Sequence, residues 1–404
     1  MDKKRYLLYG LFFVAGLAAA TLISHLSARG AIHKPVVSPA TATIGRAERS
    51  TNAWGNLEAL RIPLADSENF FPDRAARLQP PRWFFEDFSQ SRVIEFLNSC
   101  GLTEAQKTEL FKAAWLVASN GLEVLPSNAL VRSLSSGSRQ QIYSLLARSS
   151  ANYVQQFPFR FSPAEFGNRF DNNGLSPTKM NLLRSLIYTN GDSLCFADLQ
   201  VLQDFLTAKE FKEAVESLYE LPAYRLRLRI YPDSDVDALI NYWGKGGRSK
   251  KIKPLLESMS KVPKETGTTI GIGYFLSPFA RARLYTFPEA WPEVQSRRED
   301  CFWTSMNFFN EQPDMRFLDA NFVANVLQTE CEPVKGHPSF GDLVTLVNEA
   351  GAPIHMCVYI AEDFVFTKNG MNQLAPWAMM KIPDMLLSFS AEKRPRMMIL
   401  RRKP

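Results

Sequence analysis

The change in sequence pattern near Lys264 constrains the fold of this chain more than any other feature. Between Trp83 and Lys264, several Ser or Thr residues are followed three positions later by Gln or Glu, and then by apolar residues at helical spacing. This pattern is typical of a capped helix start, and it occurs at Thr103 with Gln106, Ser138 with Gln141 and Thr207 with Glu210. Beyond Lys264, short runs rich in β-branched and aromatic residues alternate with turn residues, which predicts strands.

Two segments of the first region carry specific predictions. The capping box at Thr103 predicts a helix that runs through Leu110 and Val117 and stops at Gly121. Residues 225–230 alternate arginine with an apolar residue, which predicts one half-buried strand with an arginine face. Residues 83–264 are therefore predicted to form a mostly α-helical domain.

The second region, residues 265–404, is predicted to be an α+β domain with a small antiparallel sheet. Runs of strand-forming residues lie at 341–347, 353–360, 364–367 and 397–400. The turn at 361–363 makes the second and third of these runs a hairpin. A short apolar helix is predicted to begin at Asp300, whose carboxylate suits an N-cap.

The N-terminus predicts export from the cytoplasm. Basic residues at positions 3–5 precede an uncharged run from Tyr6 to Leu26, and roughly 17–25 apolar residues are enough for a transmembrane helix. A cleaved signal peptide is the alternative, with the alanines at 18–20 as its exit. We expect a transmembrane anchor over 1–26, because the apolar run continues past the alanines, and a tether with an extended lead-in over 27–82. Either reading places most of the chain on the periplasmic or extracellular side.

Composition excludes several classes of function. The net charge of +6 is small for 404 residues, and the chain has no dense Lys/Arg tract, so no nucleic-acid partner is expected. The five cysteines include no Cys-x-x-Cys pair, so neither a metal nor a cofactor is predicted. A basic, glycine-containing loop at 245–251 lacks the spacing of a phosphate-binding P-loop. It is either a solvated face or a contact for an anionic glycan, a peptide carboxylate or a lipid headgroup.

Cys301 and His355 together indicate nucleophilic chemistry. Asp300 places Cys301 in the first turn of the predicted helix, where unpaired N–H groups and the helix dipole favour a thiolate. The same N–H groups can stabilise an oxyanion. His355 follows on a predicted strand and can serve as general base. The competing interpretation is that both residues are packing groups of the core.

The residue that orients His355 is left open between two candidates. On a strand, Cys357 shares the face of His355, because successive side chains alternate. A three-residue hairpin loop at 361–363 would place Asn369 opposite His355 and Thr367 opposite Cys357, whereas a two-residue loop would bring Lys368 to that face. Asn369 is the preferred candidate on this argument, and Thr367 is the alternative.

The last third of the chain resembles the NlpC-type papain-like cysteine peptidases of bacterial cell envelopes. The resemblance rests on Asp300-Cys301, the Gly-Asp-Leu-Val run at 341–344, and His355 followed by Val-Tyr-Ile at 358–360. It implies that Cys301 is the nucleophile, that His355 is the base, and that the third residue lies twelve positions after the histidine, at Thr367. The family commonly has Ser-Gly after its cysteine, and this chain has Phe-Trp at 302–303, which puts the family's usual specificity in doubt.

The sequence as a whole thus predicts an α+β protein with an N-terminal transmembrane helix, a helical middle domain and a papain-like C-terminal domain. The predicted activity is hydrolysis of an amide bond in envelope peptidoglycan, or in another anionic polymer, through Cys301 and His355. Two alternatives remain: a catalytically inactive envelope binding or scaffold protein, and an acyltransferase or lipid-directed hydrolase of the same fold. The oligomeric state is not predicted.

Overall fold

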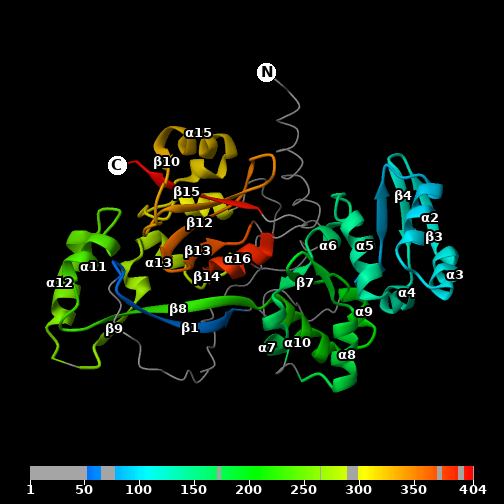
Figure 1. The fold of residues 1–404 in the computed structure, drawn as a ribbon, viewed down its shortest axis with the longest axis horizontal. Coiled ribbons are helices and arrows are strands. Elements are labelled where there is room, and N and C mark those ends of the chain that lie inside the picture. Colours follow the sequence, from blue (N-terminus) through cyan, green and yellow to red (C-terminus); the bar gives the residue numbers. More distant parts are fainter. Residues whose placement is uncertain are drawn as a thin grey trace, which may run out of the picture. The chain divides into compact units, whose positions relative to one another are not determined.

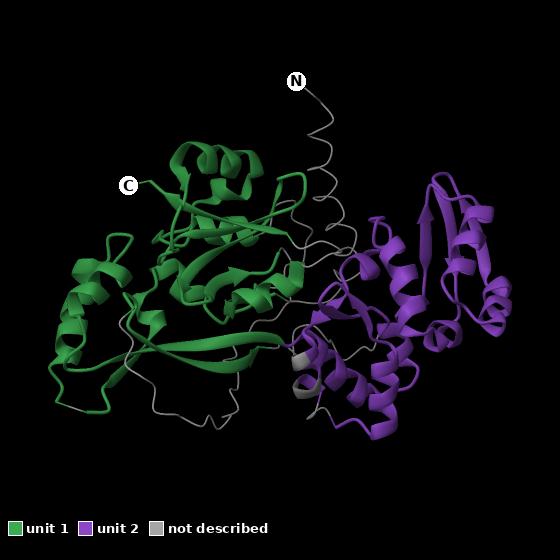
Figure 2. Cartoon of the chain, in the orientation of Figure 1, with its two compact units in different colours: residues 1–64, 221–389, 394–404 green, residues 65–220, 390–393 purple. Residues whose placement is uncertain are grey.

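The computed structural model describes residues 52–64, 78–170, 174–263, 265–288, 299–370, 375–389 and 395–403. The chain forms two compact units. Unit 1 takes in residues 1–64, 221–389 and 394–404, and unit 2 takes in residues 65–220 and 390–393 (Figure 2). Each unit has its own hydrophobic core, and we describe the units separately.

Unit 2 combines short helices with two small antiparallel sheets (Figure 1). One sheet has the order β2-β4-β3, built from Trp83–Glu86, Gly121–Leu125 and Ala114–Ala118. The other has the order β5-β7-β6, built from Phe159–Phe161, Ser193–Phe196 and Tyr188–Asn190. The helices are α2 (Gln90–Ser99), α3 (Glu104–Lys112), α4 (Asn128–Ser133), α5 (Ser136–Leu146), α6 (Tyr153–Gln156), α7 (Pro163–Phe170), α8 (Pro177–Ser185), α9 (Leu199–Gln203) and α10 (Ala208–Tyr219).

Capping chemistry explains where several of these helices begin. The reciprocal capping boxes predicted at Thr103 and Thr207 are both present, with Gln106 and Glu210 as their partners. The box predicted at Ser138 is wrong by one turn, because the hydroxyl of Ser135 caps α5 instead. A side-chain acceptor at the N-cap satisfies an otherwise unpaired N–H, so these residues set the helix starts.

The helix predicted to run from Thr103 to Gly121 is corrected to a helix followed by a hairpin. Helix α3 ends at Lys112, and the chain continues as β3 and β4, joined by the two-residue turn at 119–120. In β4, Leu122 and Val124 are buried, because this strand pairs with β2 and its alternate residues face the core. Non-local pairing with β2 therefore overrides the helical spacing that continues past Lys112.

Unit 1 is built around a six-stranded antiparallel sheet with the order β10-β15-β11-β12-β13-β14 (Figure 1). These strands are Cys331–Pro333, Arg396–Arg402, Leu343–Val347, Pro353–Ala361, Phe364–Lys368 and Trp377–Lys381, respectively. A separate three-stranded sheet has the order β1-β8-β9, formed by Asn56–Leu64, Leu221–Ile230 and Thr268–Gly271. The helices are α11 (Val236–Trp243), α12 (Ser249–Ser260), η1 (Ile272–Phe275), α13 (Pro278–Arg283), α14 (Cys301–Met306), η2 (Met315–Leu318), α15 (Ala320–Glu330) and α16 (Ile382–Phe389).

The strand predicted at 225–230 is confirmed, and it moves the boundary between the units. Strand β8 pairs along its length with β1 and also pairs with β9. Within 225–230 its apolar residues are buried and its arginines lie at the more exposed positions. Because β8 belongs to unit 1, the units divide at residue 220 rather than at 264. Residues 56–64, predicted as part of a lead-in, form strand β1.

The two faces of the six-stranded sheet carry different helices. On one face, Met356 and Val358 of β12 belong to the same core as Trp303 of α14. On the other face, Cys357 belongs to a second core with Met385 of α16. The sheet therefore lies between α14 and α16, and successive residues of β12 face opposite helices.

The fold class expected from the sequence is corrected by these observations. Residues 83–264 do not form one helical domain: residues 83–220 combine helices α2–α10 with two small sheets in unit 2, and residues 221–264 belong to unit 1. No helix within the described part of the chain is long and apolar enough to span a membrane. The segment from Tyr6 to Leu26, predicted as a transmembrane helix, lies outside the described residues. The described chain is a mixed α/β protein of two units.

Candidate functional site around Cys301 and His355

Cys301 is the first residue of helix α14, as predicted. The carboxylate of Asp300 accepts a hydrogen bond from the Trp303 N–H at 2.7 Å, which caps the helix. The hydroxyl of Ser305 donates to the Cys301 carbonyl at 2.8 Å. Trp303 is fully buried and packs edge-on against Phe279, with ring centroids 5.1 Å apart. These contacts hold the start of α14 firmly inside unit 1.

The thiol of Cys301 is protonated at neutral pH, contrary to the expected thiolate. Burial raises the pKa of the Cys301 thiol to about 12, and the adjacent Asp300 carboxyl adds to this shift. A hydrogen bond from the Met356 backbone and the charge of Lys368 lower the pKa by smaller amounts. Cys301 is only 4% exposed, so the loss of hydration outweighs the stabilisation that a helix N-terminus offers a thiolate.

His355 lies on β12 and is completely buried. Its Nε2 atom is 3.1 Å from the Thr367 hydroxyl, and its ring stacks on Phe389 of α16 with centroids 4.1 Å apart. Its Nδ1 atom has no hydrogen-bond partner within the described structure. Burial lowers the pKa of His355 to about 3, so the imidazole is neutral over the physiological range.

Thr367 and Asn369 are both placed near His355, in series rather than as alternatives. The Thr367 hydroxyl donates to Asn369 Oδ1 at 3.2 Å, so its oxygen is free to accept from a protonated Nε2 of His355. The Asn369 amide in turn donates to the Ser388 hydroxyl at 3.3 Å. Thr367 is thus the direct partner of the histidine, and Asn369 orients Thr367.

Cys301 and His355 are not joined by a hydrogen bond. Nε2 of His355 is engaged with Thr367, and Nδ1 has no hydrogen-bond partner among the residues that the structure describes. His355 shares a strand face with Cys357, which packs in the core beneath α16. Helix α14 packs its Trp303 against the opposite face. The structure therefore brings together three of the four predicted site residues and leaves the thiol of the fourth outside their hydrogen-bonded chain.

The remaining cysteines give no second reactive centre. All five are buried and none is in a disulfide, so Cys100 and Cys195 are unpaired. Burial raises the pKa of the Cys357 thiol well above its ordinary value, and the nearby Cys301 adds to the shift. Within the described residues, no group of three or more His, Cys, Asp and Glu side chains is placed to hold a metal ion.

Two features of the site were missed by the sequence analysis. Phe389 covers the imidazole from α16, and the Met356 N–H approaches the Cys301 thiol. No local sequence pattern assigns the aromatic ring of Phe389 to His355, because helix α16 and strand β12 are brought together only by the fold. The contact of the Met356 N–H with the thiol depends on the separation of β12 and β13 at this point. These strands pair only between residues 358–361 of β12 and residues 364–366 of β13.

Comparison of the chain with protein-family models, curated proteins and solved structures gave no match. The resemblance to NlpC-type peptidases therefore stays a prediction that rests on the motifs alone.

Proposed function

We propose that unit 1 is a non-catalytic binding or scaffold module of the cell envelope, with the residue order of a cysteine hydrolase but without its reactive pair. The observation that carries this proposal is the state of the two central residues. Cys301 is buried as a thiol, while His355 is buried as a neutral imidazole, stacked on Phe389 and hydrogen-bonded to Thr367. The proposed partner is peptidoglycan or another anionic polymer.

The pKa values make this state a poor starting point for nucleophilic attack. A thiol with a pKa of about 12 is ionised in about one molecule in 10⁵ at pH 7. An imidazole with a pKa of about 3 is too weak a base to remove the thiol proton efficiently, because a general base works best when its pKa lies near the operating pH. Activation would require both groups to gain access to water and to each other.

The proposal is tested by alkylating the purified chain with iodoacetamide across pH 6–10 and following each cysteine by peptide mass spectrometry. We expect Cys301 to react more slowly than an ordinary thiol throughout, and His355→Gln to leave its rate below pH 8 unchanged. Cys331, which is 7% exposed, is the internal reference for a buried thiol. Rapid labelling of Cys301 below pH 8 that disappears in His355→Gln would refute the non-catalytic assignment.

A cysteine hydrolase acting on envelope peptides is the second candidate. It is favoured by the position of Cys301 at a capped helix start and by the His355–Thr367–Asn369 chain, which would orient an imidazole. In this case the imidazole would have to leave Phe389 to reach the thiol. Incubation with isolated peptidoglycan decides between the candidates: peptide release by the wild type above that of Cys301→Ala supports hydrolysis, and equal release excludes it.

A further inference from the structure

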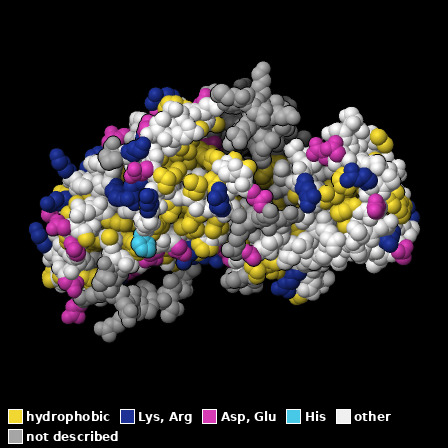
Figure 3. All heavy atoms as spheres, turned by 45° about the horizontal axis from the view of Figure 1, so that its top comes forward, with side chains coloured by type: hydrophobic (Ala, Val, Ile, Leu, Met, Phe, Trp, Pro, Cys, Tyr) yellow, Lys and Arg dark blue, Asp and Glu magenta, His cyan; other side chains and the backbone are white. Residues whose placement is uncertain are grey.

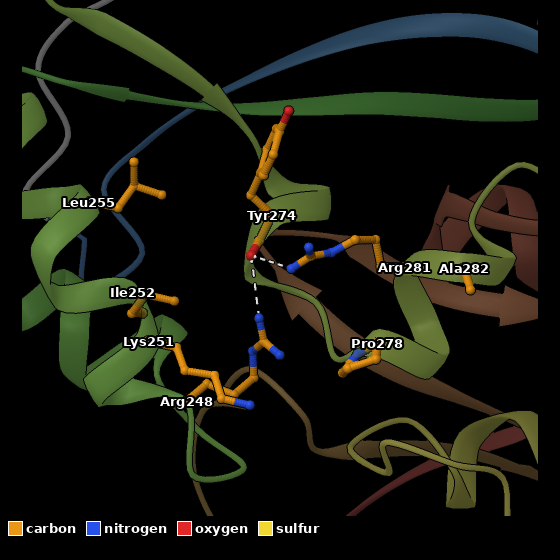
Figure 4. A pocket seen from close by; sticks show the side chains of 8 residues that line it. All are labelled: Arg248, Lys251, Ile252, Leu255, Tyr274, Pro278, Arg281 and Ala282. Atoms are coloured by element: carbon orange, nitrogen blue, oxygen red, sulfur yellow. Dashed lines mark hydrogen bonds between the residues drawn. The ribbon is translucent and has the colours of Figure 1, made fainter.

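A pocket of about 510 Å³ lies away from Cys301, between α12, η1 and α13 of unit 1. Three cationic residues line it, together with an aromatic and several apolar residues. The lining residues are Arg248, Lys251, Ile252, Leu255, Tyr274, Pro278, Arg281 and Ala282 (Figure 4). The volume is within the range of small-molecule sites, and no acidic residue is among the lining residues.

Arg248 is the least usual residue of this pocket. It is only 7% exposed, and one terminal nitrogen donates to the Tyr274 carbonyl oxygen at 3.3 Å. Its Nε is buried and has no hydrogen-bond partner within the described structure. A buried guanidinium is normally paired or fully hydrogen-bonded, because an unmatched buried donor costs about 1–3 kcal/mol or more. Nε itself is shielded from solvent, so a ligand in the pocket would meet the guanidinium of Arg248 at its terminal nitrogens.

Arg281 approaches the same carbonyl from α13. Its guanidinium donates to the carbonyl oxygens of Gly273 at 3.0 Å, Tyr274 at 2.9 Å and Leu276 at 3.3 Å. Figure 4 shows the guanidinium groups of Arg248 and Arg281 meeting at the Tyr274 carbonyl. Burial and the charge of Arg281 together lower the pKa of Arg248, and Glu311 opposes this shift. Two like charges are thus held close together by backbone acceptors that carry no full negative charge.

Among the described residues, Glu311 is the acidic group that acts on Arg248, and it does not neutralise this pair of arginines. Glu311 forms an ion pair with Lys251 at 3.1 Å, and both side chains are largely exposed, so this contact is weak and readily exchanged. Ile252, Leu255, Pro278 and Ala282 give the lining an apolar part, and Tyr274 is 62% exposed. A guanidinium binds carboxylate and phosphate oxygens through paired, charge-assisted hydrogen bonds, and an apolar wall favours a ligand that has a non-polar body.

We propose that this pocket binds an oxyanion, a phosphate or a carboxylate, attached to a small apolar or aromatic group. Arg248 and Arg281 hold the oxyanion, Lys251 adds a third positive charge, and Ile252 and Tyr274 contact the apolar group. The basic loop at 245–251 is then part of a binding site rather than a solvated face. Elsewhere on the surface, basic and acidic side chains are interspersed on the face that Figure 3 shows.

The test is isothermal titration calorimetry of the full chain with phenyl phosphate and with benzoate, using benzyl alcohol as the uncharged control. We expect at least one anion to bind with a dissociation constant of about 1 mM or lower, and benzyl alcohol to bind at least tenfold more weakly. Tighter binding of phenyl phosphate assigns the pocket to phosphates, and tighter binding of benzoate assigns it to carboxylates. Binding of neither anion, or equal binding of benzyl alcohol, overturns the proposal.

Matched variants locate the binding. Arg281 is exposed, so Arg281→Gln should fold, and it is expected to weaken anion binding tenfold or more. Lys253→Gln removes a charge from an exposed position of the same helix α12 without touching the pocket, so it should leave affinity unchanged. Arg248→Lys keeps the charge but removes the planar guanidinium that binds an oxyanion through paired hydrogen bonds, and it should weaken binding as well. Equal losses in Arg281→Gln and Lys253→Gln would show general charge attraction and not this site.

Discussion

The burial of His355 makes the stability of unit 1 depend on pH, and this dependence can be worked out from the structure. Burial lowers the pKa of His355 from 6.5 to about 3 in the folded chain. Between these two values the unfolded chain binds a proton that the folded chain does not, so stability is fully present above pH 6.5 and is lost as the pH falls. Each pH unit within this window removes about 1.4 kcal/mol.

The magnitude is large enough to measure. Lowering the pH from 7 to 5 should remove about 2 kcal/mol from the free energy of unfolding of unit 1 through His355 alone. His355→Gln, which keeps a side-chain donor near Thr367 but cannot titrate, should lack this component. His337→Gln is the matched control, because His337 is an exposed histidine of the same unit. Between pH 7 and pH 5, the wild type and His337→Gln should each lose about 2 kcal/mol more of the free energy of unfolding than His355→Gln loses.

The assay must report on unit 1 separately, because a chain with two compact units need not unfold in a single transition. Urea unfolding at pH 7 and pH 5 meets this requirement when it is monitored through hydrogen exchange of the β12 peptide, measured by mass spectrometry. The effects of other acidic groups cancel in the difference between wild type and His355→Gln. If the two proteins lose the same stability between pH 7 and pH 5, His355 is not buried as a neutral group and the reasoning is refuted.

Two further changes follow from the packing. Phe389→Leu removes the ring that covers the imidazole, so we expect it to destabilise unit 1 by about 1 kcal/mol. It should also move the pKa of His355 back towards its ordinary value, as measured by imidazole NMR. An unchanged pKa of His355 would show that the ring of Phe389 does not shield the imidazole. Asp198→Asn leaves Arg139, its fully buried partner at 2.9 Å, without a counter-charge. It should destabilise unit 2 by about 3–5 kcal/mol in urea unfolding. The control is Glu257→Gln, which breaks the exposed ion pair with Lys253 and should change stability by less than about 0.5 kcal/mol.

Local signals in the sequence predicted much of the secondary structure of unit 1. The N-cap at Asp300 and the strands around His355 and Thr367 were all identified, because capping and period-two alternation are local properties. Alternation also placed Cys357 on the same face as His355, in agreement with the structure. What the sequence could not provide was the identity of the helix that covers each face of the sheet. That depends on packing between distant segments, and here it puts α16 and its Phe389 over the histidine.

The errors in unit 2 and in the division of the chain have a similar origin. The apolar spacing after Thr103 fitted a longer helix, but pairing of β4 with β2 made a strand more favourable beyond Lys112. Strand β8 was recognised, yet its partner β1 lies more than 150 residues earlier in the chain, so no local pattern could assign it to unit 1. The pocket was indicated only by the basic loop at 245–251, because Tyr274 and Arg281 join it from other elements.

Whether Cys301 and His355 form a reactive pair is decided by NMR titration of the His355 imidazole in the wild type and in Cys301→Ala. We expect a neutral ring with its proton on Nε2, no titration between pH 5 and pH 8, and the same behaviour in both proteins. An imidazole that titrates within this range, with a pKa that changes when Cys301 is replaced, would show that the two groups are coupled and that unit 1 holds a reactive pair.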